Sequence, residues 1–421
     1  MTSLKPIVEM KDSGFQFIGM IPNDWDVRRG KTILSVINRP VNEDDGVVTC
    51  FRDGEVTLRV NRRVEGFTNS DKEIGYQGVE PGDLVVHGMD GFAGSIGISD
   101  SRGKMSPIII VLESSENKKY LMYYLRAMAF REVFLALSTG IRVRSCDLRW
   151  SKLAVFPFVI PNKEEQRAIA DYLDDRCSKL DEIITEAEKS IEEYKELKQA
   201  VIDQYSMFGI NKDVNIRETD YFWFPYMPSH WKLIRANRLF KEDVRPVQDG
   251  DISLSLSQVD GLIPTDDMSE RSLKSATHDN WKHVIPEDLV LNRFKGHLGV
   301  FFASKYEGMV SFHYGVYHAI REGVLSKYYE YLFHSTTYKN IFALLSNGVT
   351  VGLQNLSNSN FYSVKLLLPP IEEQIDIVKY LDEHIARIDS LISEKQSLIE
   401  DLKAYKKSLI YEIVTGKRRV V

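Results

Sequence analysis

Two arginines at alternating positions, Arg142 and Arg144, have a type and spacing suited to contacting a nucleic acid. They follow Ser138-Thr139-Gly140, a segment typical of a turn. Side chains two residues apart in an extended segment face the same side. Because a guanidinium can donate two parallel hydrogen bonds to one guanine edge, we predict that this loop contacts DNA, with an ordinary surface salt bridge as the alternative.

A second loop with a similar beginning, Ser346-Asn347-Gly348, carries neutral polar residues in place of the arginines. Its Thr350, Gln354 and Asn355 suit adenine edges or phosphate oxygens. The remaining candidates for DNA contact are basic residues elsewhere in the chain: Arg52, Arg62, Arg63, His87, Arg293 and Lys295. For each of them, a salt bridge within the protein is an equally good interpretation.

The chain lacks the motifs of several enzyme classes. The glycine-rich stretch at 88–97 has neither the dinucleotide fingerprint nor the Walker lysine, so we interpret it as turns and close strand approach. The nine histidines form no H-E-x-x-H pattern and no metal-ligand spacing with cysteine, and no G-x-S-x-G element occurs. We therefore expect no catalytic residues, no metal site and no cofactor.

Cysteine usage and charge limit the cellular settings and the kinds of partner that the sequence allows. Three widely spaced cysteines form no disulfide framework, and neither a signal-peptide core nor an apolar run of membrane-span length occurs. These features predict a cytoplasmic protein without membrane association. The net charge of −6 arises mainly in residues 164–205, which hold 6 basic and 13 acidic residues. The rest of the chain is close to neutral, which is compatible with a basic face for DNA.

The elements that must position the candidate loops occur twice. Pro161-Asn162-Lys163-Glu164-Glu165-Gln166 is repeated 208 residues later at 369–374, and residues 164–205 share 15 identities with residues 372–413. Pro22-x-x-Trp25 near the start of the chain also resembles Pro228-x-x-Trp231. The chain is therefore an internal repeat of two, each copy consisting of a variable body followed by a similar tail.

Each tail predicts one long helix. Apolar residues recur every three or four positions from Leu173 to Val201 and again from Leu381 to Ile413. This spacing is typical of a left-handed coiled coil, interrupted only at Lys198, Lys395 and Lys406. We predict that the two helices pair antiparallel within one chain rather than between chains. The residues that we assign to helix pairing are Leu173, Leu180, Ile184, Ile191, Leu381, Ile388, Ile392 and Ile399.

Two glutamates lie at the start of each predicted helix. They are Glu164 and Glu165 in the first tail, and Glu372 and Glu373 in the second. Negative charge in the first turn complements the positive end of the helix dipole. We prefer this interpretation to a catalytic carboxylate pair.

The bodies combine short apolar runs with turn signals. Residues 47–51 and 56–60 flank Arg52-Asp53-Gly54-Glu55 in a hairpin pattern, and residues 119–137 and 327–345 indicate helices. The predicted fold class is α/β (α+β), with two pseudo-twofold-related domains separated by two long antiparallel coiled-coil helices. The predicted division of the chain has domains at 1–160 and 211–368 and helical segments at 161–210 and 369–421.

The segments FPFVIPNKEEQRAIADYLD and KLLLPPIEEQIDIVKYLDEHIARID together resemble the specificity subunit of type I restriction–modification systems. The second segment matches the family's P-P-x-E-E-Q form, whereas the first has Asn162 in place of the second proline. The resemblance covers nearly the whole chain, including the P-x-x-W start of each body and the S-x-G loop.

This resemblance implies a non-catalytic subunit. Each body would be a target recognition domain that reads one half of a split sequence in double-stranded DNA, and the paired helices would set the gap between the halves. The helices would also dock two methyltransferase subunits, which recruit restriction subunits. Adenine methylation and ATP-driven cleavage would belong to these partners.

Two other functions stay open at this point. A DNA adenine methyltransferase with its own recognition domain would require a cofactor motif, and no N-P-P-Y-type motif occurs. A coiled-coil scaffold without DNA contact would show no salt-dependent binding to duplex DNA.

Overall fold

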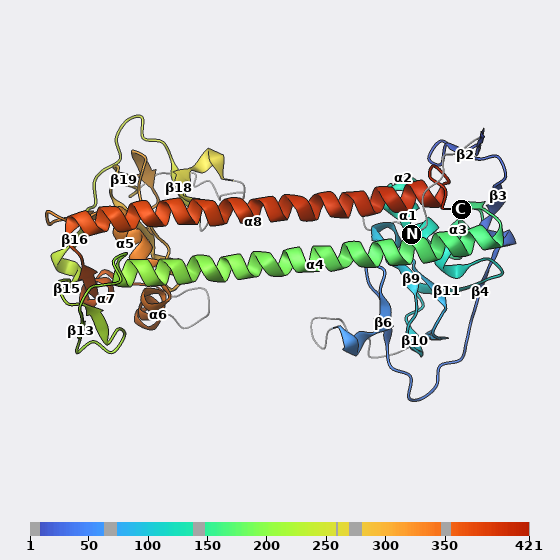
Figure 1. Ribbon diagram of the computed structural model, residues 1–421, viewed down its shortest axis with the longest axis horizontal. Coiled ribbons are helices and arrows are strands. Elements are labelled where there is room, and N and C mark those ends of the chain that lie inside the picture. Colours follow the sequence, from blue (N-terminus) through green and yellow to red (C-terminus); the bar gives the residue numbers. More distant parts are fainter. Residues whose placement is uncertain are drawn as a thin grey trace. The chain divides into compact units, whose positions relative to one another are not determined.

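The computed structural model describes residues 9–62, 74–137, 148–257, 260–268, 280–346 and 355–420. The chain forms two compact units, and each contains one body and a segment of each long helix, α4 (Lys163–Phe208) and α8 (Ile371–Val414) (Figure 1). Unit 1 comprises residues 1–188 and 397–421, and unit 2 comprises residues 189–396. No helix among the described residues is both long enough and apolar enough to cross a bilayer.

The body of unit 1 is built on a four-stranded antiparallel sheet in the order β4-β11-β8-β9. These strands are β4 (Leu34–Val36), β8 (Leu84–His87), β9 (Ile96–Ile98) and β11 (Ile109–Ser114). Four antiparallel strand pairs accompany the sheet: β1 (Met10–Asp12) with β2 (Met20–Pro22), β3 (Asp26–Arg29) with β12 (Pro157–Ile160), β5 (Val48–Cys50) with β6 (Val56–Leu58), and β7 (Gln77–Val79) with β10 (Gly103–Met105). The helices of this body are α1 (Lys118–Phe130), α2 (Val133–Ala136) and α3 (Trp150–Leu153).

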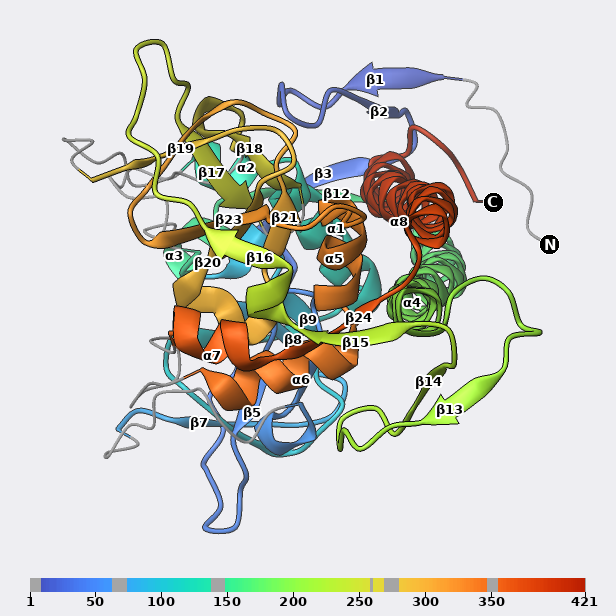
Figure 2. The same cartoon turned by 90° about the vertical axis from the view of Figure 1, so that its left-hand side faces the viewer.

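Unit 2 repeats this order of elements. Its sheet runs β16-β23-β20-β21, formed by β16 (Phe240–Glu242), β20 (Leu289–Asn292), β21 (Phe301–Ala303) and β23 (Tyr314–Ala319). The accompanying pairs are β13 (Ile216–Glu218) with β14 (Tyr226–Pro228), β15 (Lys232–Arg235) with β24 (Lys365–Leu368), β17 (Leu254–Ser257) with β18 (Gly261–Pro264), and β19 (Lys282–Val284) with β22 (Gly308–Val310). Three helices, α5 (Ser326–Phe333), α6 (Thr336–Leu345) and α7 (Asn358–Ser363), lie near β15 and β24 (Figure 2). The repeated order confirms the predicted duplication of an α/β body.

The long helices pair antiparallel within each unit, as predicted. In unit 1 the Nζ atom of Lys406 lies 2.6 Å from the carboxylate of Asp181, and in unit 2 the Nζ atom of Lys198 lies 2.7 Å from Asp389. The two pairs occupy equivalent repeat positions, because both the lysines and the aspartates are 208 residues apart. Intramolecular pairing therefore explains two of the three lysines that interrupt the apolar stripe, because Lys198 and Lys406 each reach an acidic residue on the neighbouring helix.

The apolar stripe is buried along most of both helices. Leu173 and Leu381 are fully buried, and Leu180, Ile184, Ile191, Ile388 and Ile399 are each less than a tenth exposed, whereas Ile392 is partly buried. The predicted stripe differs from the buried face at the end of α4, where Ile202 is buried and the predicted Val201 is only partly buried. A straight helix has 3.6 residues per turn, so its buried face drifts away from a strict 3.5-residue repeat.

Both predicted body helices are interrupted. The segment predicted as one helix at 119–137 divides into α1 and α2 at Glu132, whose φ of +57° is left-handed. The segment at 327–345 divides into α5 and α6 at Ser335, whose hydroxyl accepts a hydrogen bond from the Tyr338 amide. A side chain that caps a new helix competes with continuation of the preceding one.

Candidate nucleic-acid interface

Five of the eleven candidates for DNA contact lie outside the described part of the chain: Arg63, Arg142, Arg144, Thr350 and Gln354. The residues that follow the two candidate loops are described, and they are held in the same way. The Leu148 amide donates to the Gly88 carbonyl at 2.8 Å, and the Leu356 amide donates to the Arg293 carbonyl at 3.2 Å. The chain that follows each candidate loop is therefore attached to the segment after the equivalent sheet strand, β8 or β20.

The antiparallel pairing of β5 with β6 confirms the predicted hairpin at 47–60. Arg62 lies beside this hairpin. Its guanidinium is 2.6 Å from the carboxylate of Asp53 and 3.0 Å from that of Glu55. It also lies over the Phe51 ring, 4.3 Å from the centroid. Arg52 is likewise paired, with Asp90 at 2.9 Å. These contacts match the salt-bridge alternative, and a DNA contact by Arg62 stays a prediction.

His87 stabilises the turn after β8. Its Nδ1 atom accepts hydrogen bonds from the amides of Met89 and Asp90, at 3.3 and 3.0 Å. Burial lowers the pKa of His87 despite the nearby Asp90 carboxylate, so the neutral acceptor form prevails at pH 7. A neutral, half-buried imidazole contributes no positive charge toward a phosphate.

The second body brings three of the candidates to one place. Arg293 and Lys295 lie in the 3₁₀ segment after β20, and this segment contacts the chain next to Asn355 through Leu356. Lys295 and Asn355 are exposed, whereas Arg293 is engaged by Glu242 and Asn358. The exposed pair is therefore the part of this set that is open to a ligand.

A duplicated bond joins each tail to its body, and sequence reasoning missed it. In unit 1 the indole Nε1 of Trp25 donates to Glu165 at 3.0 Å, and in unit 2 that of Trp231 donates to Glu373 at 2.8 Å. These glutamates do more than complement the helix dipole, because they also satisfy the buried indole N–H. The signal was present, since P-x-x-W and E-E-Q recur together in both copies.

The glutamine of the same motif fixes the entry to each helix. Gln166 accepts from the Asn117 amide and donates to the Pro161 carbonyl, both at 2.9 Å. Gln374 accepts from the Leu325 amide and donates to the Pro369 carbonyl at the same distances. Both side chains are fully buried. The E-E-Q motif is thus a joint between the last strand, the body helix and the long helix.

Tyrosines of the body helices complete this joint. Tyr123 donates to Asp174 in unit 1 and Tyr331 donates to Asp382 in unit 2. These aspartates end the repeated Tyr-Leu-Asp motif at 172–174 and 380–382. The motif residues therefore have assembly roles within each unit.

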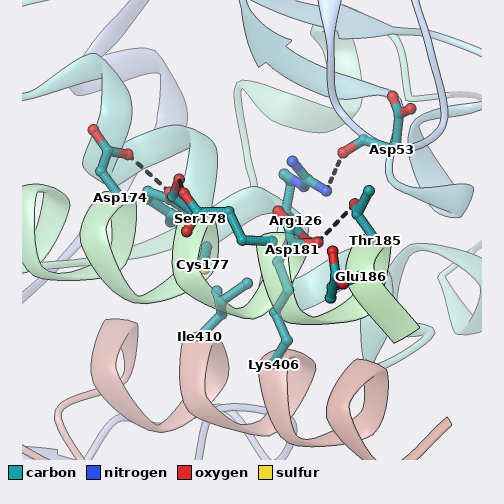
Figure 3. Close-up of a pocket in the computed structure, with 12 residues that line it drawn as sticks. Asp53, Arg126, Asp174, Cys177, Ser178, Asp181, Thr185, Glu186, Lys406 and Ile410 are labelled. Carbon is teal, nitrogen blue, oxygen red and sulfur yellow. Dashed lines mark hydrogen bonds and ion pairs between the residues drawn. The ribbon is translucent and has the colours of Figure 1, made fainter. Parts of the chain in front are cut away.

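A cavity of about 720 Å³ in unit 1 lies between the β5–β6 hairpin, α1, α4 and α8 (Figure 3). Arg126, Asp181 and Lys406 contribute charges to its lining, and Cys177 contributes a thiol whose pKa is raised by burial. A protonated thiol is a poor nucleophile. No group of residues suited to a metal ion occurs in the described part of the chain.

Comparisons with known proteins agree with this architecture. Residues 256–401 match the family described as Type I restriction modification DNA specificity domain. The EcoKI specificity subunit of Escherichia coli K12 is 20% identical over 95% of this chain and 90% of its own length. The provisionally named type I restriction enzyme MjaX specificity subunit of Methanocaldococcus jannaschii is 22% identical over 96% of both chains.

Two solved structures share the fold. A chain from a structure concerned with complex assembly and conformational transition of the type I restriction–modification system has a TM-score of 0.68 and 12% identity, over 94% of this chain and 98% of that one. The HsdS subunit from Thermoanaerobacter tengcongensis has a TM-score of 0.53 and 12% identity, over 94% and 97%. The chain is thus similar over nearly its whole length to type I restriction–modification specificity subunits, and it shares the fold of these two solved structures.

Proposed function

We propose that this chain selects DNA sites for a type I restriction–modification complex by reading a bipartite target, one half with each body. The observation that carries this proposal is the duplication of the loop attachment: Leu148 on Gly88 and Leu356 on Arg293. The domains would be residues 1–160 and 211–368, joined by helical segments at 161–210 and 369–421. Catalysis would belong to other subunits, acting with this chain in the cytoplasm.

Recognition would combine contacts to phosphates with a few contacts to base edges. Arg142, Arg144, Thr350, Gln354 and Asn355 are the proposed base-edge residues. Arg62, Arg63, His87 and Lys295 would be secondary contacts, and of these Lys295 is exposed while Arg62 and His87 are engaged within the body. Each wrong base pair should then reduce binding by about 1–3 kcal/mol.

The paired helices would serve as the docking surface for two methyltransferase subunits, which in turn recruit restriction subunits. One line of support is that a solved structure with a similar fold concerns the assembly of a type I restriction–modification complex. Support also comes from the duplication of α4 and α8, since two equivalent helical segments suit two copies of one partner.

Exchange of residues 1–160 for the corresponding region of another family member tests the division into domains. The expected result, measured by mapping methylated adenines in DNA modified by the assembled complex, is a change in one half of the target only. A change in both halves, or in neither, would contradict the assignment of one half to each body.

Lengthening the helices tests their role as a spacer. Inserting about four residues into both α4 and α8 adds roughly 6 Å, or about one turn. At 3.4 Å per base pair, the gap between the target halves should grow by about one or two base pairs. Methylation mapping would again give the answer, and an unchanged gap would reject the spacer role.

A further inference from the structure

A network of charged and polar side chains lies beside the end of the second candidate loop. The Arg293 guanidinium donates to Glu242 at 2.5 Å and to Asn358 at 2.9 Å, and Asn358 also donates to Glu242. Lys282 donates to the same glutamate at 2.8 Å. The Tyr317 hydroxyl adds a hydrogen bond to Asn358 at 2.7 Å. The network joins β16, β19, β23, the segment after β20 and the first residue of α7.

The network is partly shielded from water. The Lys282 and Glu242 side chains are 7% and 13% exposed, and that of Arg293 is 23% exposed. Burial alone would raise the pKa of Glu242, but hydrogen bonds from Lys282 and Asn358, with the charge of Arg293, lower it instead. The carboxylate is therefore ionised at neutral pH and holds the network together.

The network holds the chain on both sides of Leu356. The Leu356 amide donates to the Arg293 carbonyl, and Asn358 accepts from the Arg293 guanidinium. Leu356 itself is fully buried and packs closely on Gly296, where an added Cβ would lie 2.6 Å from the leucine Cβ. One arginine thus uses its backbone and its side chain to fix residues that directly follow the candidate loop.

Unit 1 repeats the backbone bond without the charged network. The positions equivalent to Glu242, Lys282, Arg293 and Asn358 hold Val36, Gln77, Gly88 and Trp150. Gln77 donates to the Ile109 carbonyl at 2.6 Å, and a side chain at Gly88 would collide with the Ile108 carbonyl. These four positions of unit 1 carry no charged side chain, so the ionic attachment is not a requirement of the shared fold.

We propose that Arg293, Glu242 and Asn358 form a clamp that positions Asn355, the described end of the second candidate loop, for reading its half of the target. This inference rests on the proposed function and assigns Arg293 a positioning role in place of a base contact. Readout by hydrogen bonds requires donors and acceptors held close to their productive geometry. Releasing the clamp lets the chain at Asn355 and Leu356 adopt more conformations, so the right and the wrong base pair are distinguished less well.

The test uses the full-length chain assembled with its methyltransferase partner. Wild-type targets are first found by mapping methylated adenines, and initial methylation rates are then measured on duplexes with single base-pair changes in each half. For Arg293→Gln we expect about tenfold weaker discrimination in the half read by residues 211–368, with the other half unchanged. Asn358→Ser should give the same pattern, and the double variant should be no worse than either single variant, because the residues act together.

Two further variants separate positioning from charge. Arg293→Lys keeps the positive charge but loses the planar fork that reaches both Glu242 and Asn358, so it should resemble Arg293→Gln. Lys241→Gln removes an exposed charge from the same strand and should leave both halves as in the wild type.

The outcomes that overturn the clamp are distinct. Full activity of Arg293→Lys, or a changed preference at a single base pair that Asn358→Ser does not share, would assign Arg293 to direct DNA contact. Equal loss in both halves would indicate general destabilisation, and unchanged discrimination in Arg293→Gln would remove the role altogether. Failure of the proposed function would be seen earlier, as a wild-type complex without a bipartite target.

Discussion

The two units agree where the long helices meet the bodies and differ where the candidate loops are attached. Trp25 and Trp231, Gln166 and Gln374, and Asp181 and Asp389 make the same bonds in both copies. The attachment of the second loop adds a charged network, whereas the equivalent positions of unit 1, Val36, Gln77, Gly88 and Trp150, are uncharged. Contacts that any copy needs for assembly are thus duplicated, whereas the surroundings of the loops are free to diverge.

The largest expected effect is loss of the indole that joins each tail to its body. Trp25 is fully buried and Trp231 is 2% exposed, so Trp25→Ala and Trp231→Ala should each destabilise the affected unit by about 3–5 kcal/mol. Hydrogen exchange in each unit would measure this separately. Phe222→Ala, at an 88% exposed site, is the control and should have little effect. A small loss in only one unit would show that the joints are not equivalent.

Loss of the glutamate charge should reduce stability by different amounts at the two joints. The Glu165 side chain is 4% exposed and forms a two-pronged ion pair with Arg419 at 2.8 and 2.9 Å, whereas Glu373 is 38% exposed and contacts His230. We expect Glu165→Gln to reduce stability by about 1.5–3 kcal/mol, and Glu373→Gln by about 0–1 kcal/mol. Urea denaturation followed by hydrogen exchange would test the order, and equal losses would contradict it.

Acid sensitivity offers a third contrast, centred on Glu242. Its pKa is lowered in the folded state, so its contribution to stability is complete above the unfolded pKa of about 4.3 and is lost as pH falls through the folded pKa. Unit 2 should therefore lose stability on acidification more steeply in the wild type than in Glu242→Gln. Parallel pH profiles from thermal unfolding of the two proteins would contradict the expectation.

The smallest effects are expected from the lysines that interrupt the helix stripe. The Lys198 and Lys406 side chains are 33% and 20% exposed, and their aspartate partners are at least half exposed. Lys198→Met and Lys406→Met should change stability by about 1 kcal/mol or less. Thermal unfolding at low and high salt should show a weaker salt dependence in both variants, and a large loss in either would mean that pairing depends on that ion pair.

Local patterns predicted a substantial part of the architecture. The apolar stripes indicated α4 and α8, the turn Arg52-Asp53-Gly54-Glu55 indicated the β5–β6 hairpin, and the 208-residue repeat indicated two equivalent bodies. These features depend on residue spacing, which is a property of the chain itself. The division of each predicted body helix into two was missed, because a single left-handed or capping residue outweighed the surrounding helical pattern.

For the candidate interface, the sequence predicted which regions of the chain take part but not which individual side chains are free to contact DNA. The type of a residue such as Arg62 or His87 does not reveal that Asp53 or the Met89 amide will occupy its polar atoms. Lys295 and Asn355 were chosen as candidates by their residue type, and the structure shows that both residues are exposed.

By itself, the sequence determined the duplication, the paired helices and the resemblance to type I specificity subunits, because each depends on a pattern of residues that recurs in both copies. Only the tertiary structure decided that Trp25 bonds Glu165, 140 residues away, and that Arg293 joins Glu242 to Asn358. The reason is physical. Periodicity specifies which side of an element is buried, whereas the partner of a polar group depends on which distant groups arrive within hydrogen-bonding distance when the chain folds.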